Sequence, residues 1–161
     1  MNEIWLRQAE EDDIQALYLL FSPVDQMHRD AHPEIFKQAE YPEDIKKYYR
    51  TCILDPNVTI IIAERKKKMI GGVICSLETA PSIPILVPRK IACIENITVS
   101  QAFRNKGVGR LLIDAIQDWA VQRGASAIEL TVWEFNRAAA RFYERLGFQP
   151  FRRRMVKNLN G

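Results

Sequence analysis

Alternating and helical spacings of apolar residues divide the first third of the chain into recognisable elements. Residues 4–9 alternate between apolar and polar side chains and predict a strand. Residues 10–21 begin with acids and continue with apolar residues at helical spacing, which is typical of a helix start. Residues 41–54 predict a second helix with Pro42 in its first turn. Residues 22–41 contain prolines and charges and predict no regular element.

The middle of the chain predicts a hairpin and a further strand. Residues 58–64 and 69–77 are rich in β-branched side chains, and the basic sequence RKKK between them is typical of a polar turn. Gly71 and Gly72 lie inside the second strand of this hairpin and indicate a bulge or a close backbone approach. After a connection that contains several prolines, residues 91–100 predict another strand.

The last third of the chain predicts two helices and two strands. Residues 109–124 carry apolar residues at helical spacing and end at a glycine, and residues 126–133 predict a strand. Residues 136–147 predict a short helix with Asn136 as its N-cap, and residues 148–159 an irregular final strand. The order is strand, two helices, three strands, helix, strand, helix, strand. We therefore expect an α/β (α+β) fold with a mixed central sheet flanked by helices.

Length and charge narrow the class of protein. A chain of 161 residues predicts a single domain over residues 1–161, and a net charge of +3 favours a local anion pocket over a nucleic-acid surface. No apolar run is long enough for a membrane span or a signal peptide, so we expect a cytoplasmic protein with no membrane partner. Cys52, Cys75 and Cys93 are widely spaced and predict free thiols. His28 and His32 lack a recognised metal pattern, so no metal is expected.

A glycine-containing segment, VSQAFRNKGVGRLL, precedes the long helical pattern of the last third. Gly107 and Gly109 lie at the expected helix start, where backbone N–H groups lack partners and an anion is stabilised. Walker A and Rossmann signatures both fail, because Arg110 follows the second glycine and Leu112 stands where a third glycine would be. A turn with solvated charges is the alternative. The basic residues around the two glycines are Arg104, Lys106 and Arg110.

Two motifs in this region resemble a known family. RNKGVG, residues 104–109, matches the first signature of the GCN5-related N-acetyltransferases (GNAT superfamily). NRAAARFYERLGF, residues 136–148, resembles the second signature, and a predicted strand separates the two in the expected order. The resemblance is close over residues 91–148. It implies the GNAT fold and acetyl-CoA as cosubstrate.

The resemblance also implies where the cosubstrate binds. The loop around Gly107 would wrap its diphosphate, and the pantetheine arm would run beside the strand of residues 91–100 like an added strand. Asn136 would bond that arm, although a simple N-cap is the alternative. The residues that the resemblance assigns to cofactor binding are Ile97, Thr98, Val99, Arg104, Asn105, Lys106, Gly107, Val108, Gly109, Arg110, Asn136, Ala139 and Tyr143.

Two residues are candidates for the chemistry of acetyl transfer. Glu95 has the same parity as Ile97 and Val99, so its side chain is expected to share their face. If that face lines the cleft, Glu95 could accept the proton of the attacking amine directly or through water. A solvent-facing or ion-paired glutamate is the alternative. In many relatives a tyrosine at the position of Tyr143 is the general acid at the cofactor sulfur; core packing is the alternative.

These residues lead to a hypothesis of direct acetyl transfer in a ternary complex. The acceptor is left open among a small amine, a polyamine, an amino sugar and a protein amine, and a homodimer is expected by family analogy alone. The aromatic residues that either line the acceptor site or pack are Phe36, Tyr41, Tyr48 and Tyr49.

The alternative function is a non-catalytic acyl-CoA sensor. The basic sequences RKKK and FRRRMVK lack the interleaved aromatic residues of a nucleic-acid surface, so no nucleic-acid partner is expected.

Overall fold

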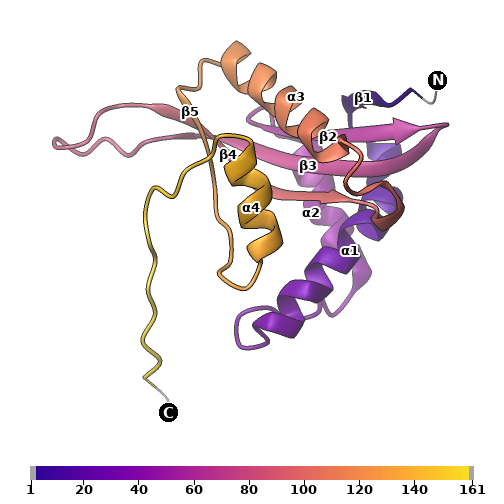
Figure 1. The fold of residues 1–161 in the computed structure, drawn as a ribbon, viewed down its shortest axis with the longest axis horizontal. Helices are drawn as coiled ribbons and strands as arrows, with labels where there is room; N and C mark the ends of the chain where they lie inside the picture. The colour runs from indigo at the N-terminus through magenta and orange to yellow at the C-terminus, as the bar shows by residue number, and fades with distance from the viewer. Residues whose placement is uncertain (1–2, 160–161) are drawn as a thin grey trace. The chain divides into compact units, whose positions relative to one another are not determined.

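The computed structural model describes residues 3–159, which form two compact units, one reaching to Thr131 and the other beginning at Val132. The first unit contains one sheet with the strand order β1-β2-β3-β4-β5 (Figure 1). The first three strand pairs are antiparallel, and β4 and β5 are parallel. This arrangement confirms the predicted mixed sheet. The strands are β1 (Trp5–Gln8), β2 (Val58–Arg65), β3 (Lys68–Thr79), β4 (Lys90–Val99) and β5 (Ala127–Leu130).

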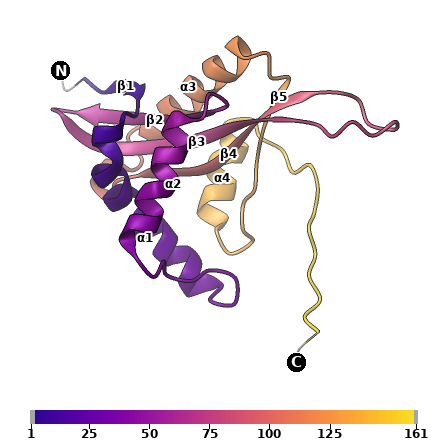
Figure 2. The same cartoon turned by 180° about the vertical axis from the view of Figure 1, so that it is seen from behind.

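Helices cover both faces of this sheet (Figures 1 and 2). An added Cβ at Gly71 would lie 3.2 Å from Leu112 on one face, and one at Gly72 would lie 3.2 Å from Leu20 on the other. The two glycines therefore allow the close backbone approach that the sequence indicated. The helices of the first unit are α1 (Ile14–Ala31) and α2 (Pro42–Leu54) on one face and α3 (Val108–Gln122) on the other, with short 3-10 turns η1 (Glu11–Asp13) and η2 (Gln101–Phe103).

Apolar side chains at the predicted spacings fill both layers. Between α1, α2 and the sheet, a cluster of buried residues includes Phe21, Tyr49 and Ile74. On the other side, α3 buries Leu112 and Ile116 completely, which are one turn apart on the same helix face. The periodic positions read from the sequence are therefore the positions that build the core.

Two bulges interrupt the sheet. In the β2–β3 ladder Ala63 pairs with Gly71 and Glu64 pairs with Met69, so one residue of β3 is left over, directly before Gly71. In the β3–β4 ladder Ile74 pairs with Asn96, whereas Cys75 pairs with Ile94. The residue left over on β4 is number 95. A bulge bends its strand and changes the direction of side chains, and bulges are frequent next to active sites.

The first helix is longer than predicted. It continues through Pro23 to Ala31, although the sequence suggested no regular element after residue 21. Pro23 removes one backbone hydrogen bond, but the Ser22 hydroxyl donates to the Tyr18 carbonyl at 2.7 Å in the same turn. The following residues contain no further helix breaker until Pro33, so the helix resumes.

The end of the chain differs more from the prediction. Residues 148–159 form no strand, and β5 ends at Leu130 rather than at residue 133. Pro150 cannot donate to a strand ladder, and three consecutive arginines follow it. The second unit contains α4 (Arg137–Arg145), which confirms the predicted short helix.

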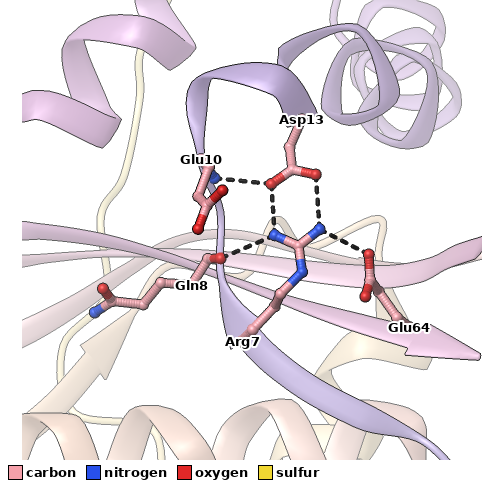
Figure 3. Close-up of polar contacts among 5 residues, drawn as sticks. All are labelled: Arg7, Gln8, Glu10, Asp13 and Glu64. Carbon is pink, nitrogen blue, oxygen red and sulfur yellow. Dashed lines mark hydrogen bonds and ion pairs between the residues drawn. The ribbon is translucent and has the colours of Figure 1, made fainter. Parts of the chain in front are cut away.

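A polar cluster ties β1 to its neighbours (Figure 3). The Arg7 guanidinium donates to both carboxylate oxygens of Asp13, at 2.7 and 2.9 Å, and to Glu64 Oε1 at 2.7 Å. Asp13 also accepts the Glu10 amide at 2.8 Å, which caps η1. The Arg7 hydrogen bonds lower the pKa of Asp13 below its usual range. One guanidinium thus joins β1, η1 and β2.

Candidate functional site

The start of α3 is a turn in which two residues have a positive φ. Gly107 is the N-cap residue with φ 83°, and Asn105 also has a positive φ of 58°. The first intrahelical bond runs from the Leu111 amide to the Gly107 carbonyl at 3.1 Å. The helix therefore offers no acceptor to the amides of Val108, Gly109 and Arg110, which follow Gly107. An added Cβ at Gly107 would meet no atom within 4 Å, so space above the turn is open.

The basic side chains of this turn are partly used to brace it. Arg104 Nε donates to the Val99 carbonyl at 3.0 Å, and Lys106 Nζ donates to the Ala102 carbonyl at 2.9 Å. Arg110 Nε lies 3.8 Å from a carboxylate one turn further along α3. The positive charges stay at the exposed turn, where they add to the partial positive charge of the helix start.

The second half of β4 has an open edge. Residues 91–94 of β4 pair with β5, and within the part of the chain that the structure describes, residues 95–99 have no partner in β5. The Ser100 amide donates to the Ile70 carbonyl at 2.8 Å, on the β3 side. Because hydrogen-bonding directions alternate along an antiparallel ladder, the backbone groups of Thr98 face β3, whereas those of Ile97 and Val99 face the open edge.

Glu95 is the unpaired residue of the β4 bulge. Its Oε2 accepts a hydrogen bond of 2.7 Å from the Tyr48 hydroxyl, so the carboxylate lies on the face covered by α2. Ile97 instead pairs with Val73, which alternates with Ile74 of the α1–α2 cluster and therefore belongs to the α3 face. The parity argument that placed Glu95 on the face of Ile97 and Val99 is wrong, because the bulge shifts the alternation by one residue.

Three cysteines surround this part of the sheet as free thiols. Burial raises the pKa of Cys75 and of Cys93 to about 12, and burial also raises the pKa of Cys52. A thiol with a raised pKa carries little thiolate at neutral pH and is a poor nucleophile. The chain's cysteines therefore do not suit a covalent acetyl-enzyme mechanism.

The second signature lies in the second unit. Asn136 Oδ1 accepts the Ala139 amide at 3.1 Å, so Asn136 is the N-cap of α4. Tyr143 is buried, and its ring centroid lies 5.2 Å from that of Phe142 and 5.6 Å from that of Phe148. Burial raises the pKa of the Tyr143 hydroxyl to about 12, which keeps it protonated at neutral pH.

The two histidines that were considered as metal ligands contact neighbouring side chains. His28 stacks on Phe36 with ring centroids 5.1 Å apart, and His32 Nδ1 lies 2.8 Å from Glu34 Oε1. Among residues 3–159, no group of three or more His, Cys, Asp or Glu side chains is arranged to hold a metal ion. Nor does any helix in that range have the length and apolar character to cross a membrane.

The sequence pointed to Tyr48 and Glu95 separately and did not predict that they contact each other. Tyr48 was a candidate for either lining or packing, and nothing in the local pattern indicates its hydrogen bond to Glu95, 47 residues away. The bulge that brings Glu95 toward α2 also lacks a local signal, because residues 91–99 contain neither glycine nor proline.

Comparison with known proteins identifies the family and supports the fold. The family model described as "Acetyltransferase (GNAT) family" matches residues 21–148. The uncharacterized N-acetyltransferase YhfO of Bacillus subtilis is 26% identical over 144 residues, 89% of each chain. A mutant of the BH1408 protein from Bacillus halodurans has a TM-score of 0.89 with 26% identity, over 96% of this chain and 99% of the other.

A more distant structure shares the fold. Aminoglycoside N-acetyltransferase AAC(6′)-Iy, solved in complex with CoA, has a TM-score of 0.78 with 17% identity, over 100% of this chain and 97% of the other. The five-stranded mixed sheet, the open edge of β4 and the glycine turn before α3 occur here together with both sequence signatures. The chain belongs to the acetyltransferase (GNAT) family.

Proposed function

We propose that this protein is an N-acetyltransferase that transfers the acetyl group of acetyl-CoA to a primary amine in a ternary complex. The observation that carries the proposal is the open edge of β4, which leads along the chain to the amides at the start of α3 that have no acceptor within the helix. Together they offer a strand-like partner for an amide-containing arm and a positive end for its diphosphate. Family membership supports acetyl transfer as the reaction class.

The cosubstrate would occupy both features at once. The backbone groups of Ile97 and Val99 would pair with the amides of the pantetheine arm, and the amides that follow Gly107 would bind the diphosphate. Each such charge–dipole contact contributes roughly 0.3–1 kcal/mol at an exposed site. Arg104 and Lys106 add positive charge. The open space at Gly107 leaves room for phosphate oxygens close to the backbone, and the complex of AAC(6′)-Iy with CoA is consistent with this choice of ligand.

The reaction joins an amine nitrogen to the acetyl carbon and breaks the carbon–sulfur bond. A free alkylamine has a pKa of about 10.4, so it must lose a proton to attack. Glu95, exposed on the α2 face of the bulge, accepts the amine proton directly or through water. Backbone N–H groups at the open edge of β4 stabilise the negative carbonyl oxygen of the intermediate.

The departing sulfur needs a donor, which we assign to Tyr143. Its hydroxyl is a donor because burial raises its pKa to about 12. A thiol has a pKa of roughly 8.5, so complete proton transfer from this hydroxyl to the thiolate is uphill. Tyr143 would therefore act mainly by donating a hydrogen bond to the sulfur as negative charge develops there.

The two compact units would act as one catalytic domain. The family match over residues 21–148 includes parts of both, which supports this reading. Asn136 and Ala139 already bond to each other as N-cap and first-turn amide. A second contact from the Asn136 side chain to the pantetheine arm is compatible with that cap, because an amide side chain has further donors and acceptors.

An acetyl-CoA turnover assay with a panel of amines tests the proposal. The panel contains a small alkylamine, a diamine, a polyamine, an amino sugar, and peptides with a free N-terminus or a lysine. We expect one class to release CoA thiol and an equal amount of acetylated amine. Tight CoA binding without turnover of any amine would favour the alternative function, a non-catalytic acyl-CoA sensor, over the enzyme.

A further inference from the structure

One side-chain hydrogen bond connects α2 to the β4 bulge. The Tyr48 hydroxyl donates to Glu95 Oε2 at 2.7 Å, across 47 residues of sequence. A hydrogen bond from a neutral donor to a carboxylate is stronger than one between two neutral groups. Both side chains are exposed at the surface, so the bond lies where a substrate from solvent could reach the carboxylate.

The two partners of this bond differ in how firmly they are held. Tyr48 stands on α2 beside Tyr49, whose ring lies 5.7 Å away and belongs to the buried α1–α2 cluster together with Cys52. The helix carrying Tyr48 is therefore fixed by core packing. Glu95 is the extra residue of the bulge and takes no place in the β3–β4 register. Its carboxylate depends on a side-chain contact for its orientation.

We propose that Tyr48 is a positioning residue for the reaction. Its hydroxyl holds Glu95 Oε2 and leaves Oε1 to receive the proton of the acceptor amine. This inference rests on the proposed function, because it assumes that Glu95 is the base. The bond fixes the carboxylate relative to the open edge of β4.

The Tyr48 hydroxyl stays protonated and can donate to Glu95. Burial and the neighbouring Glu95 raise the pKa of Tyr48 well above its usual range, so the hydroxyl remains a donor at neutral pH. The other titratable groups that interact with Glu95 are the thiols of Cys52 on α2, Cys75 on β3 and Cys93 on β4. Each of these thiols has a raised pKa and stays neutral in the acidic range. These thiols therefore place no competing charge beside the carboxylate.

The test compares Tyr48→Phe with Tyr18→Phe, which removes the same hydroxyl from α1 at the edge of the same core. We expect Tyr48→Phe to lower kcat/KM for the amine about tenfold, consistent with the loss of one hydrogen bond to a charged group. The loss falls on kcat rather than on KM for the amine, and CoA affinity measured by calorimetry stays unchanged. Tyr18→Phe keeps the wild-type kcat/KM. A wild-type kcat/KM in Tyr48→Phe would overturn the proposal.

A double variant separates positioning from general damage. In the Glu95→Gln background, Tyr48→Phe should have less than a twofold further effect, because the two residues act through one carboxylate. Full multiplication of the two losses would contradict the inference. Wild-type activity in Glu95→Gln would instead refute Glu95 as the base.

Discussion

Two parts of the sheet hold carboxylates in opposite ways. At β1, Asp13 and Glu64 are bound by the Arg7 guanidinium, with three hydrogen bonds between 2.7 and 2.9 Å. At the β4 bulge, Glu95 accepts a bond of 2.7 Å from the neutral hydroxyl of Tyr48. The bond lengths are similar, but the positive guanidinium offsets part of the negative charge at the first site, and no cation does so in the bond between Tyr48 and Glu95.

The difference separates a structural contact from a candidate catalytic one. A carboxylate that shares a guanidinium fork has its charge compensated and is a poor proton acceptor. A carboxylate that is held by a neutral donor keeps its charge and one oxygen for another partner. The comparison is consistent with a structural role for the β1 carboxylates and with the proposed role of Glu95 as the base.

The largest expected effect is on catalysis at Glu95. Glu95→Gln keeps the size and a hydrogen-bonding oxygen of the side chain but removes the base, so kcat should fall by about 100-fold, within the usual range for general base catalysis. Steady-state kinetics with the amine identified in the panel measures this loss. Glu64→Gln is the matched control and should keep kcat. Equal activity losses in the two variants would remove the distinction between the sites.

The next effect is on stability at Arg7. Arg7→Met keeps much of the aliphatic stem and removes the fork, so we expect the free energy of unfolding to drop by about 1 kcal/mol, the upper end for exposed ion pairs. The value is modest because the Arg7 side chain is 39% exposed and water screens its charges. Urea denaturation measures the drop, and kcat should stay at the wild-type value. A loss of kcat without a loss of stability would place the cluster in the reaction.

The smallest expected effect is the pH dependence of what the Arg7–Asp13 ion pair contributes to the free energy of unfolding. Because Arg7 lowers the pKa of folded Asp13, the ion pair stabilises the protein above the ordinary aspartate value of about 3.9. This contribution is lost as the pH falls through the lower pKa that Asp13 has in the folded state. The difference in unfolding free energy between wild type and Asp13→Asn should thus be constant from neutral pH to about pH 5 and shrink below about pH 4. A difference that grows in acid would contradict the sign.

Elements with strong periodicity were predictable, and interruptions were not. The apolar spacing over α3 and the β-branched runs of β2 and β3 match the structure because their side chains fill the core. Pro23 was misleading, because a proline within a long helix removes only one backbone bond. The strand predicted for residues 148–159 was also wrong. Apolar residues alternate there only in part, and no ladder forms in this segment.

The site was predictable where a motif fixes the backbone. RNKGVG requires the left-handed turn found at Gly107, and the Asn136 cap follows from its side chain. The side of the sheet that Glu95 faces was not predictable from parity, because one unpaired residue reverses the alternation. Long-range pairs such as Tyr48 and Glu95 depend on how α2 packs against the sheet, which local sequence does not encode.

The most direct test of the account is calorimetric titration of CoA into wild type, Gly107→Ala and Gly124→Ala. Both glycines have a positive φ, 83° and 73°, and both have open space around an added Cβ, so the two variants carry similar backbone strain. Only Gly107 lies at the turn that would bind the diphosphate. We expect Gly107→Ala to lower CoA affinity about tenfold or more, which corresponds to at least about 1.4 kcal/mol of binding free energy, and Gly124→Ala to leave it unchanged. Equal affinities in the two variants, or no CoA binding by the wild type, would contradict it.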